Sequence, residues 1–454
     1  MDQSLMRLAA YIQSVKANGI SQAAMHAAKR RLIDSVACAA AAFQEPFCQQ
    51  LREFGSAYLH KQHKARIWGT GQFTTLEMAA LVNGVMLRYL DLSDTVLSRS
   101  NGHPSDMLGA LVAVAESQNC SGRALLQAIV ASYEIYVSLC DAVAMAAKGL
   151  DQATSAAVGT AAGVALLLGL DEAQTRHALS LSLSGHMHSY NVRCGALSDW
   201  KGCAGPNGAR HGVFSVLLAQ SGVTGPSAPV EGKGGLQTVL GDFDWQLGQG
   251  TERILQTHLK LHPVCYHGQS AVDAALALRE KIPASEVRSV RIVTYEAAYL
   301  GMGNDPQRWH PENRETADHS LPYVVATVWL DGALSTQAYQ DEQLMRADRL
   351  AWMQRIEVQS SQEMTRQFPA QSQVRIEVTD MQGRVTAHTQ RNPRGHANEP
   401  ISDTELEGKL LDCFSPWGDA ADARALMKLL WRLDQIPQVR SLVDGLVHTQ
   451  ASDL

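Results

Sequence analysis

The feature that most constrains the fold of this chain is a change in the period of its apolar residues. From the start to about residue 255, small and aliphatic residues recur every three or four positions, the spacing of packed helices. Between about 285 and 390 apolar and polar residues alternate instead, as in half-buried strands. The helical period then returns. We therefore expect a large helical domain that is interrupted by a smaller α+β domain.

The helical regions are rich in Ala and Gly, which favours helices that pack closely against one another. Six helices are expected before residue 255, at 25–43, 73–90, 106–117, 124–147, 154–170 and 172–184. Two more are expected near the C-terminus, at 403–414 and 423–436. Four strands are expected between them, at 285–297, 355–361, 373–380 and 384–390. A Met-Gln-Gly turn between the last two strands predicts a hairpin.

Charge and composition argue against several classes of protein. The 454 residues carry a net charge of −6, whereas proteins that bind nucleic acid or membrane surfaces normally carry a basic face. The eight cysteines form no C-x-x-C pair, so the sequence gives no support to a zinc ribbon or an iron–sulfur cluster. The longest apolar stretch, 156–170, is shorter than the roughly 20 residues of a membrane span. We expect a reduced, cytoplasmic protein without a secretory signal.

A polar stretch, DLSDTVLSRSNGHPSD (91–106), separates two of the expected helices. Pro104 disfavours helical geometry at His103, so this histidine is expected just before a helix. A helix N-terminus disfavours the imidazolium. A neutral histidine at this position can take part in catalysis beside an anionic substrate. Asp91 and Thr95 end the preceding helix, where an acid opposes the helix dipole. Taken alone, an ordinary helix–loop–helix with capping residues is the simpler interpretation.

Further polar clusters precede other apolar helices. Arg193, Lys201 and Arg210 lie among glycines and small residues before an expected helix that starts near residue 211. Cations in such a bend suit a carboxylate-binding pocket, although surface charge on a loop explains them equally well.

A cluster at 259–276 contains Cys265 and His267, and another cluster contains His319 and Tyr323. A thiolate nucleophile at Cys265 is one interpretation, and a buried structural cysteine is the commoner one.

Together these stretches resemble the MmgE/PrpD family. The segments that carry the resemblance occur in family order over most of the chain. They are LDLSDT and GHPSDMLGALVAVAE (within 90–116), WKGCAGPNGARHG (200–212), SGVTGPSAPVEGKGG (221–235), HPVCYHGQSAVDAAL (262–276), TADHSLPYVVA (316–326) and RGHANEPISDTELEGK (394–409). The resemblance implies an all-α domain from both chain ends (1–257 and 397–454), an inserted α+β lid (258–396) and a homodimer. It also implies chemistry without a metal or other cofactor at the interface of the two domains.

The resemblance also implies site residues, position by position. Asp91 and Thr95 match the D-x-x-D-T element, His103 matches the HPS motif, and Tyr323 matches the H-S-x-x-Y segment. The predicted catalytic residues are Asp91, His103, Lys201, His267 and Tyr323. The predicted substrate-binding residues are Thr95, Arg193, Arg210, Cys265 and His319.

Two details favour the 2-methylcitrate dehydratase branch of the family over its decarboxylase branch. The spacing from D-x-x-D-T to HPS is longer here, and Cys265 stands where decarboxylases have a histidine. The implied activity is dehydration of a small 2-hydroxy di- or tricarboxylate such as 2-methylcitrate. This needs a base for the proton α to a carboxylate, an acid for the leaving hydroxide and cations for the enolate-like charge. A cis-aconitate-type decarboxylase, a dicarboxylate epimerase and a catalytically silent dimeric binding protein remain alternatives.

Overall fold

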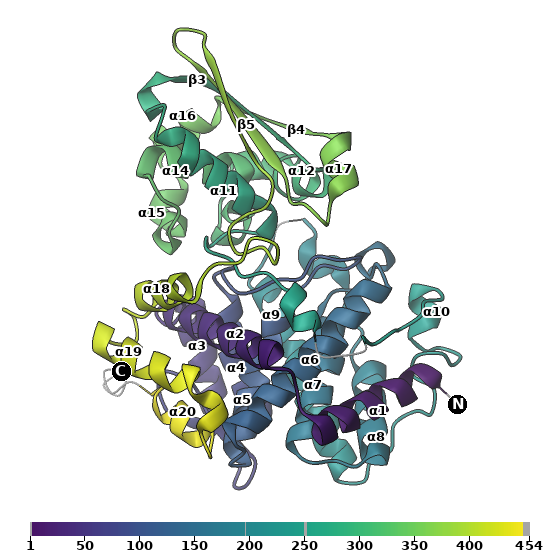
Figure 1. Cartoon of the computed structure of the whole chain (residues 1–454). Helices are drawn as coiled ribbons and strands as arrows, with labels where there is room; N and C mark the ends of the chain where they lie inside the picture. The colour runs from purple at the N-terminus through teal and green to yellow at the C-terminus, as the bar shows by residue number, and fades with distance from the viewer. Residues whose placement is uncertain (1, 196, 249–251, 448–454) are drawn as a thin grey trace.

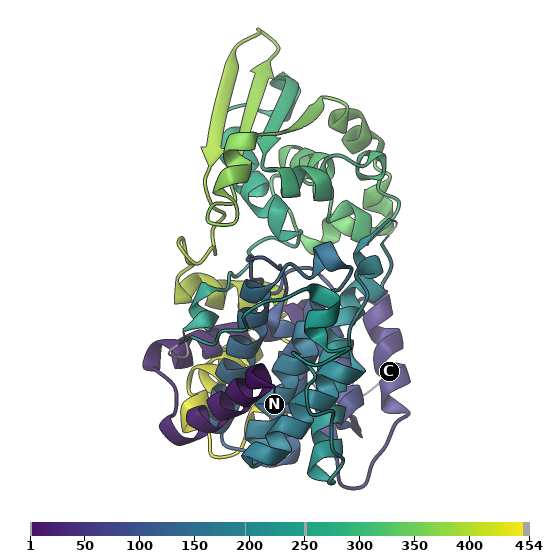
Figure 2. The ribbon, with the colours of Figure 1, turned by 90° about the vertical axis from the view of Figure 1, so that its right-hand side faces the viewer.

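The computed structural model describes residues 2–195, 197–248 and 252–447 (Figure 1). Its apolar side chains form two large cores. The first core takes its residues from 5–259 and 401–446, and the second takes them from 264–378. We call the regions around these cores the helical part and the sheet part. In Figures 1 and 2 the sheet part lies above the helical part, to which it is joined by two crossings of the chain.

The helical part contains helices from both ends of the chain, and the yellow C-terminal helix α18 packs against the purple helix α2 (Figure 1). Its N-terminal helices are α1 (Gln3–Asn18), α2 (Gln22–Ala41), α3 (Pro46–Ser56), α4 (Leu76–Arg88), α5 (Leu108–Ser117), α6 (Gly122–Ala142), α7 (Ala153–Leu167), α8 (Glu172–Gly185), α9 (Trp200–Gln220) and α10 (Leu236–Leu240). Its C-terminal helices are α18 (Asp403–Cys413), α19 (Ala420–Trp431) and α20 (Arg440–Asp444). Helix α6 is long and apolar enough to cross a membrane, but 83% of its apolar window is buried within the protein, as in a core helix.

Small residues allow helices α4, α7 and α9 to contact one another closely. A Cβ atom added at Gly212 of α9 would lie 2.5 Å from the carbonyl oxygen of Ala157 in α7. Another added at Gly84 of α4 would lie 2.8 Å from Cβ of Pro206, which sits inside α9. The absent side chains therefore let α4, α7 and α9 approach one another more closely than larger residues allow.

The sheet part is built around four strands in the order β4-β3-β5-β6. Strands β3 and β4 are parallel, and the other two pairings are antiparallel. The strands are β3 (Val287–Thr294), β4 (Ile356–Ser360), β5 (Val374–Asp380) and β6 (Val385–Gln390). The helices are α11 (Tyr266–Arg279), α12 (Glu296–Met302), α13 (Arg314–Ala317), α14 (Leu321–Asp331), α15 (Asp341–Leu344), α16 (Ala347–Met353) and α17 (Gln362–Gln367). Strand β5 alternates buried and less buried residues, as a strand covered on one face should.

The structure confirms the predicted mixture of many helices and a small sheet, and the predicted hairpin is β5–β6. Two local expectations are wrong. The segment predicted as a helix from residue 73 begins with a strand, β2 (Phe73–Thr75), which pairs with β1 (Lys64–Arg66). Helix α9 begins at Trp200 rather than near residue 211, because its packing on α4 and α7 overrides the weak helical propensity of its glycines and Pro206.

The close contact at Gly212 yields a first prediction. Replacing Gly212 by Ala should lower the free energy of unfolding by about 1–3 kcal/mol, because the new methyl group meets a backbone carbonyl that cannot move freely. The control is Gly408→Ala in α18, where no atom lies within 4 Å of the added Cβ. This control should be neutral or gain up to about 1 kcal/mol. Thermal unfolding followed by circular dichroism compares them, and equal melting temperatures would contradict the prediction.

Candidate active site

A cavity of about 540 Å³ lies between the helical part and the sheet part. The helical part supplies the loop after α4 and the short 3-10 helix Tyr190–Arg193, and the sheet part supplies the start of α11 and the 3-10 helix Pro306–Trp309. Its lining includes three histidines, His103, His267 and His319. Its basic residues are Arg88, Arg99, Arg193, Lys201 and Arg308. A cavity with this many cations suits a small anion that carries several carboxylates.

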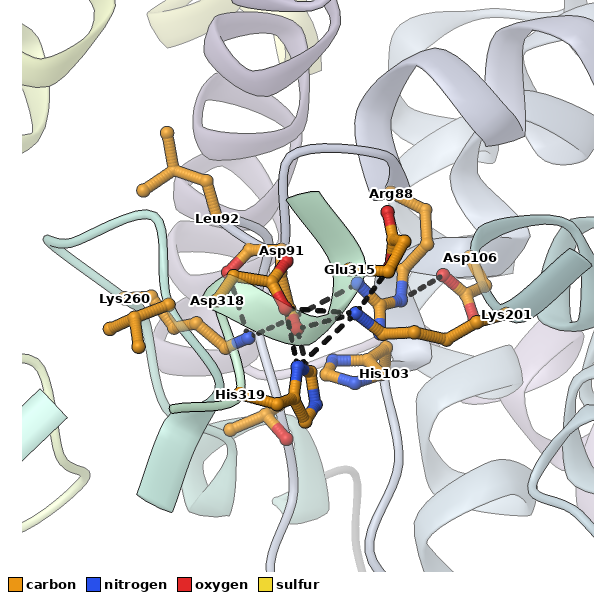
Figure 3. A network of polar contacts seen from close by, with 12 residues as sticks. Arg88, Asp91, Leu92, His103, Asp106, Lys201, Lys260, Glu315, Asp318 and His319 are labelled. Atoms are coloured by element: carbon orange, nitrogen blue, oxygen red, sulfur yellow. Dashed lines mark hydrogen bonds and ion pairs between the residues drawn. The ribbon is translucent and has the colours of Figure 1, made fainter. Parts of the chain in front are cut away.

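Asp91 is at the centre of a buried cluster of charges in the cavity wall (Figure 3). It follows α4 with a φ of 50°, a left-handed conformation that Asp adopts more readily than most residues. Its Oδ1 lies 3.0 Å from Nη1 of Arg88 and 2.5 Å from Nζ of Lys260. Its Oδ2 lies 3.4 Å from Nζ of Lys201. One carboxylate thus holds three cations, and Lys260 also donates to the Asp91 carbonyl.

These cations decide the protonation state of Asp91. Burial by itself raises the pKa of its carboxyl, but the surrounding cations, led by Arg88 and Lys260, hold that pKa well below its ordinary value. A carboxylate with so low a pKa is a weak proton acceptor near neutral pH. The geometry therefore suits Asp91, which the sequence predicts as catalytic, to orienting the lysines rather than to transferring a proton.

Lys201 joins the two parts of the molecule by charge. It lies in the first turn of α9, and its Nζ is 2.6 Å from Oε2 of Glu315 and 3.3 Å from Oδ1 of Asp318 in the sheet part (Figure 3). Burial lowers the pKa of the ammonium, but Asp318, Glu315 and Asp91 outweigh burial and raise it above its ordinary value. Lys201 is therefore a permanent cation at the junction.

His103 is held as a neutral imidazole. Its Nδ1 lies 2.8 Å from the carbonyl oxygen of Asp94, which can only accept, so Nδ1 carries the proton and Nε2 keeps its lone pair. Burial, followed by the nearby charges of Arg88 and Lys260, lowers the pKa of His103 well below its ordinary value. The Asp94 carboxylate fixes the loop by accepting from the Ser105 N–H at 3.0 Å. A neutral histidine with an open nitrogen in a cavity can accept a proton from a bound substrate.

His319 has the opposite protonation state and is charged. Its Nδ1 donates to Asp318, and its Nε2 lies 3.8 Å from Oδ2 of Asp91. Burial and the charge of Lys201 lower its pKa, but Cys265 and Asp318 outweigh them and raise that pKa to about 9. Burial raises the pKa of Cys265, and the His319 cation more than compensates, so the thiol has a pKa below its ordinary value. His319 is thus an imidazolium near neutral pH and can donate a proton.

Three more predicted residues line the cavity, and each has at least one polar group that is already engaged. Nδ1 of His267 lies 2.6 Å from the hydroxyl of Tyr295, and burial is the main cause that lowers its pKa to about 4. Thr95 donates its hydroxyl to the carbonyl of Gly102 at 2.8 Å. Arg193 pairs with Asp151 through Nε at 2.8 Å and also donates to the Lys201 carbonyl. Thr95 and Arg193 therefore shape the walls of the cavity.

Arg210 does not reach the cavity, which corrects the prediction that it binds substrate. It lies nine residues beyond Lys201 on the same helix, α9, and about 100° of rotation per residue places it on the opposite side of that helix. Its Nε donates to Oδ1 of Asn207 at 2.9 Å, one turn back. The error follows from the early start of α9, since a loop was expected between the two cations.

Tyr323 is also placed away from the cavity, contrary to its predicted catalytic role. Its side chain is fully buried in the second core, and its hydroxyl donates to the Ala338 carbonyl at 2.5 Å and accepts from Arg349. The hydroxyl is therefore satisfied inside the sheet part. Tyr323 packs inside that part of the fold and is not among the residues that line the cavity.

Several charged residues of the site are absent from the predicted site residues, although one of them, Lys260, belongs to the polar cluster at 259–276. They are Arg88, Lys260, Arg308, Glu315 and Asp318. The signal that was available for Arg88 is its place at the end of a mostly apolar helix, where a charge is buried only with a partner. The acidic partners of Lys201 lie more than a hundred residues away, and no local spacing marks them.

Ligand atoms of Asp91, Asp318 and His319 lie within 4.8 Å of one another, close enough for a metal ion. However, Nζ of Lys201 lies 3.4 Å from Asp91 and 3.3 Å from Asp318, and Lys260 lies 2.5 Å from Asp91. A divalent cation here would be repelled by both ammonium groups. This donor set fits lysine better than a metal.

Comparisons with known proteins agree with this architecture. The MmgE/PrpD N-terminal domain matches residues 6–247, and the MmgE/PrpD C-terminal domain matches residues 262–435. A 2-methylcitrate dehydratase of Cupriavidus necator is 30% identical over 367 residues, which cover 75% of this chain and 74% of that protein. One of Salmonella typhimurium is 29% identical, with the same shares. An alkylcitrate dehydratase of a fungal species is 30% identical over 59% of this chain and 57% of that protein. The chain belongs to the MmgE/PrpD family.

Proposed function

We propose that the protein is a carbon–oxygen lyase that dehydrates a small 2-hydroxy di- or tricarboxylate, such as 2-methylcitrate, without a metal ion. The observation that carries the proposal is the pairing, in one basic cavity, of a neutral histidine with a charged one. His103 has a lone pair at Nε2, and His319 has a proton to give. The similar proteins named above are dehydratases of citrate-like compounds, which supports the same reaction class.

The geometry supports one assignment of roles in the elimination. His103 takes the proton from the carbon next to a carboxylate, and the C–H electron pair becomes the new double bond. Lys201 stabilises the negative charge that develops on that carboxylate. His319 protonates the departing hydroxyl group, so the C–O bond breaks and water leaves. Asp91 stays ionised throughout and keeps Lys201 in place.

The domain arrangement and the partner follow as further parts of the proposal. The helical domain comprises residues 1–257 and 397–454, and residues 258–396 form a lid over the cavity. Two large cores, one on each side of the junction, support this division. The homodimer remains a prediction, which light scattering on the purified protein would test.

One experiment separates the dehydratase from its alternatives. The purified protein is incubated with 2-methylcitrate, citrate or cis-aconitate in D₂O with EDTA, and the products are followed by NMR and mass spectrometry. An unsaturated product without loss of carbon supports the proposal. Loss of CO₂ would identify a decarboxylase, and deuterium uptake without net elimination would identify an epimerase. Activity that disappears with EDTA and returns with added metal would contradict the metal-free chemistry.

His103 gives the sharpest mutational prediction. Replacing it with Ala should lower kcat/KM for the dehydrated substrate by about 10²–10⁴-fold, because the proton acceptor is lost. The exposed His60, which lies outside the cavity, serves as the matched control in His60→Ala. Circular dichroism would show that both variants are folded. Wild-type rates in the His103→Ala protein would remove His103 from the mechanism.

The two histidines also predict the pH dependence of kcat/KM. His103 is active when neutral, and because its pKa is well below 6.5 this condition holds throughout the neutral range. His319 is active when protonated, so activity should fall as pH rises through its pKa of about 9. The His319→Gln variant should be slower and should lack this alkaline decline. A wild-type profile that stays level up to pH 10.5, in protein shown to be folded there, would contradict the role of His319.

A further inference from the structure

We infer that Arg308 forms a carboxylate-binding subsite on the sheet-part side of the cavity; this inference rests on the proposed function and specifies its substrate class. Arg308 lies in the 3-10 helix Pro306–Trp309, lines the cavity and is only 8% exposed. Its Nε and Nη1 are buried, and within the described ranges neither has a hydrogen-bond partner. This residue was not among those that the sequence pointed to.

Two buried guanidinium nitrogens without hydrogen-bond partners favour a ligand of opposite charge. Arginine stays protonated in proteins, so the side chain cannot escape the cost of burial by losing its charge. Buried N–H groups that donate to nothing are destabilising, and natural proteins rarely keep them without a functional reason. The planar fork of Nε and the Nη atoms matches the two oxygens of a carboxylate. An anionic group of the substrate is the partner that completes this site.

The other arginines that line the cavity either have a carboxylate partner or are exposed. Arg88 pairs with Asp91 at 3.0 Å, and Arg193 pairs with Asp151 at 2.8 Å. Arg99 is exposed. Among the described residues that line the cavity, Arg308 is therefore the buried arginine that has no carboxylate partner.

The backbone holds Arg308 in a fixed relation to the proposed acid. The hydroxyl of Ser320 donates to the Arg308 carbonyl, and the same Ser320 directly follows His319 in the chain. The carboxylate of Asp305 accepts from the N–H of Gln307 at 3.0 Å and so caps the short helix. A carboxylate bound to Arg308 is thereby placed relative to His319, on the wall formed by the sheet part. In the proposed elimination a second carboxylate adjoins the carbon that His103 deprotonates, so the preferred substrate carries at least two carboxylates, and a tricarboxylate uses the subsite best.

The binding of unreactive substrate analogues tests the Arg308 subsite without requiring turnover. Calorimetry compares propane-1,2,3-tricarboxylate with glutarate, which lacks the central carboxylate, on wild type, Arg308→Gln and Arg308→Lys. We expect wild type to prefer the tricarboxylate and Arg308→Gln to bind it about 10- to 100-fold more weakly, the effect of losing charged hydrogen bonds. The loss for glutarate should be smaller, and lysine should restore part of the affinity. Arg288→Gln, at an exposed position of β3, is the matched control and should bind as wild type does.

The outcomes distinguish the subsite from a structural role and from the proposed reaction. Without ligand, Arg308→Gln should melt no lower than wild type, because among the described residues Nε and Nη1 of Arg308 make no hydrogen bond that glutamine would break. Unchanged affinity for the tricarboxylate in Arg308→Gln would overturn the inference, as would failure of the wild type to bind either analogue. Loss of binding in Arg308→Gln, together with a wild type that binds but does not dehydrate, would support the subsite while rejecting the proposed reaction.

Discussion

The ion pairs of Lys201 are the contact on which the rest of the site depends. Its ammonium is buried between the helical part and the sheet part, and a charge in that position is tolerated only when it is paired. Its partners come from both sides, Asp91 from the loop after α4 and Glu315 and Asp318 from the sheet part. The charges therefore fix how the two walls of the cavity face each other. A change in either wall would leave a buried charge without a partner.

Helix α18, near the C-terminus of the chain, stabilises this arrangement of charges. Lys409 of α18 pairs with Asp34 at 2.5 Å and donates to the carbonyls of Leu92 and Lys260 at 2.9 and 2.8 Å. These two carbonyls belong to the segments that carry Asp91 and Lys260 into the cavity wall. One buried lysine from the end of the chain thus ties together two distant segments of the site. This explains why α18 packs in the helical part although its sequence follows the sheet part.

Opposite protonation states of two histidines arise from their different partners. At His103 burial and the nearby cations Arg88 and Lys260 lower the pKa and outweigh the Asp94 carbonyl, so the ring is neutral. At His319 the charges of Cys265 and Asp318 outweigh burial and Lys201 and raise the pKa, so the ring is charged. Both side chains are partly buried, so desolvation alone does not distinguish them. The preorganised cations of the cavity then offer stabilisation to negative charge without reorganising during the reaction. The cavity therefore contains the base, the acid and the surrounding cations that the proposed elimination needs.

The sequence by itself determined many of the helices and strands and many of the residues that line the cavity. Periodicity predicted helices α2, α4 to α8, α18 and α19, and the sequence also predicted the β5–β6 hairpin. The polar clusters contained His103, Lys201, Cys265 and His319, which line the cavity. Arg210 and Tyr323 were misplaced, because whether a side chain reaches a cavity depends on where its helix begins and which face is packed. Tertiary structure alone decided the partners and the protonation states. Lys201 and Glu315 are 114 positions apart, and the energy of two charges depends on their distance in space, which local sequence does not encode.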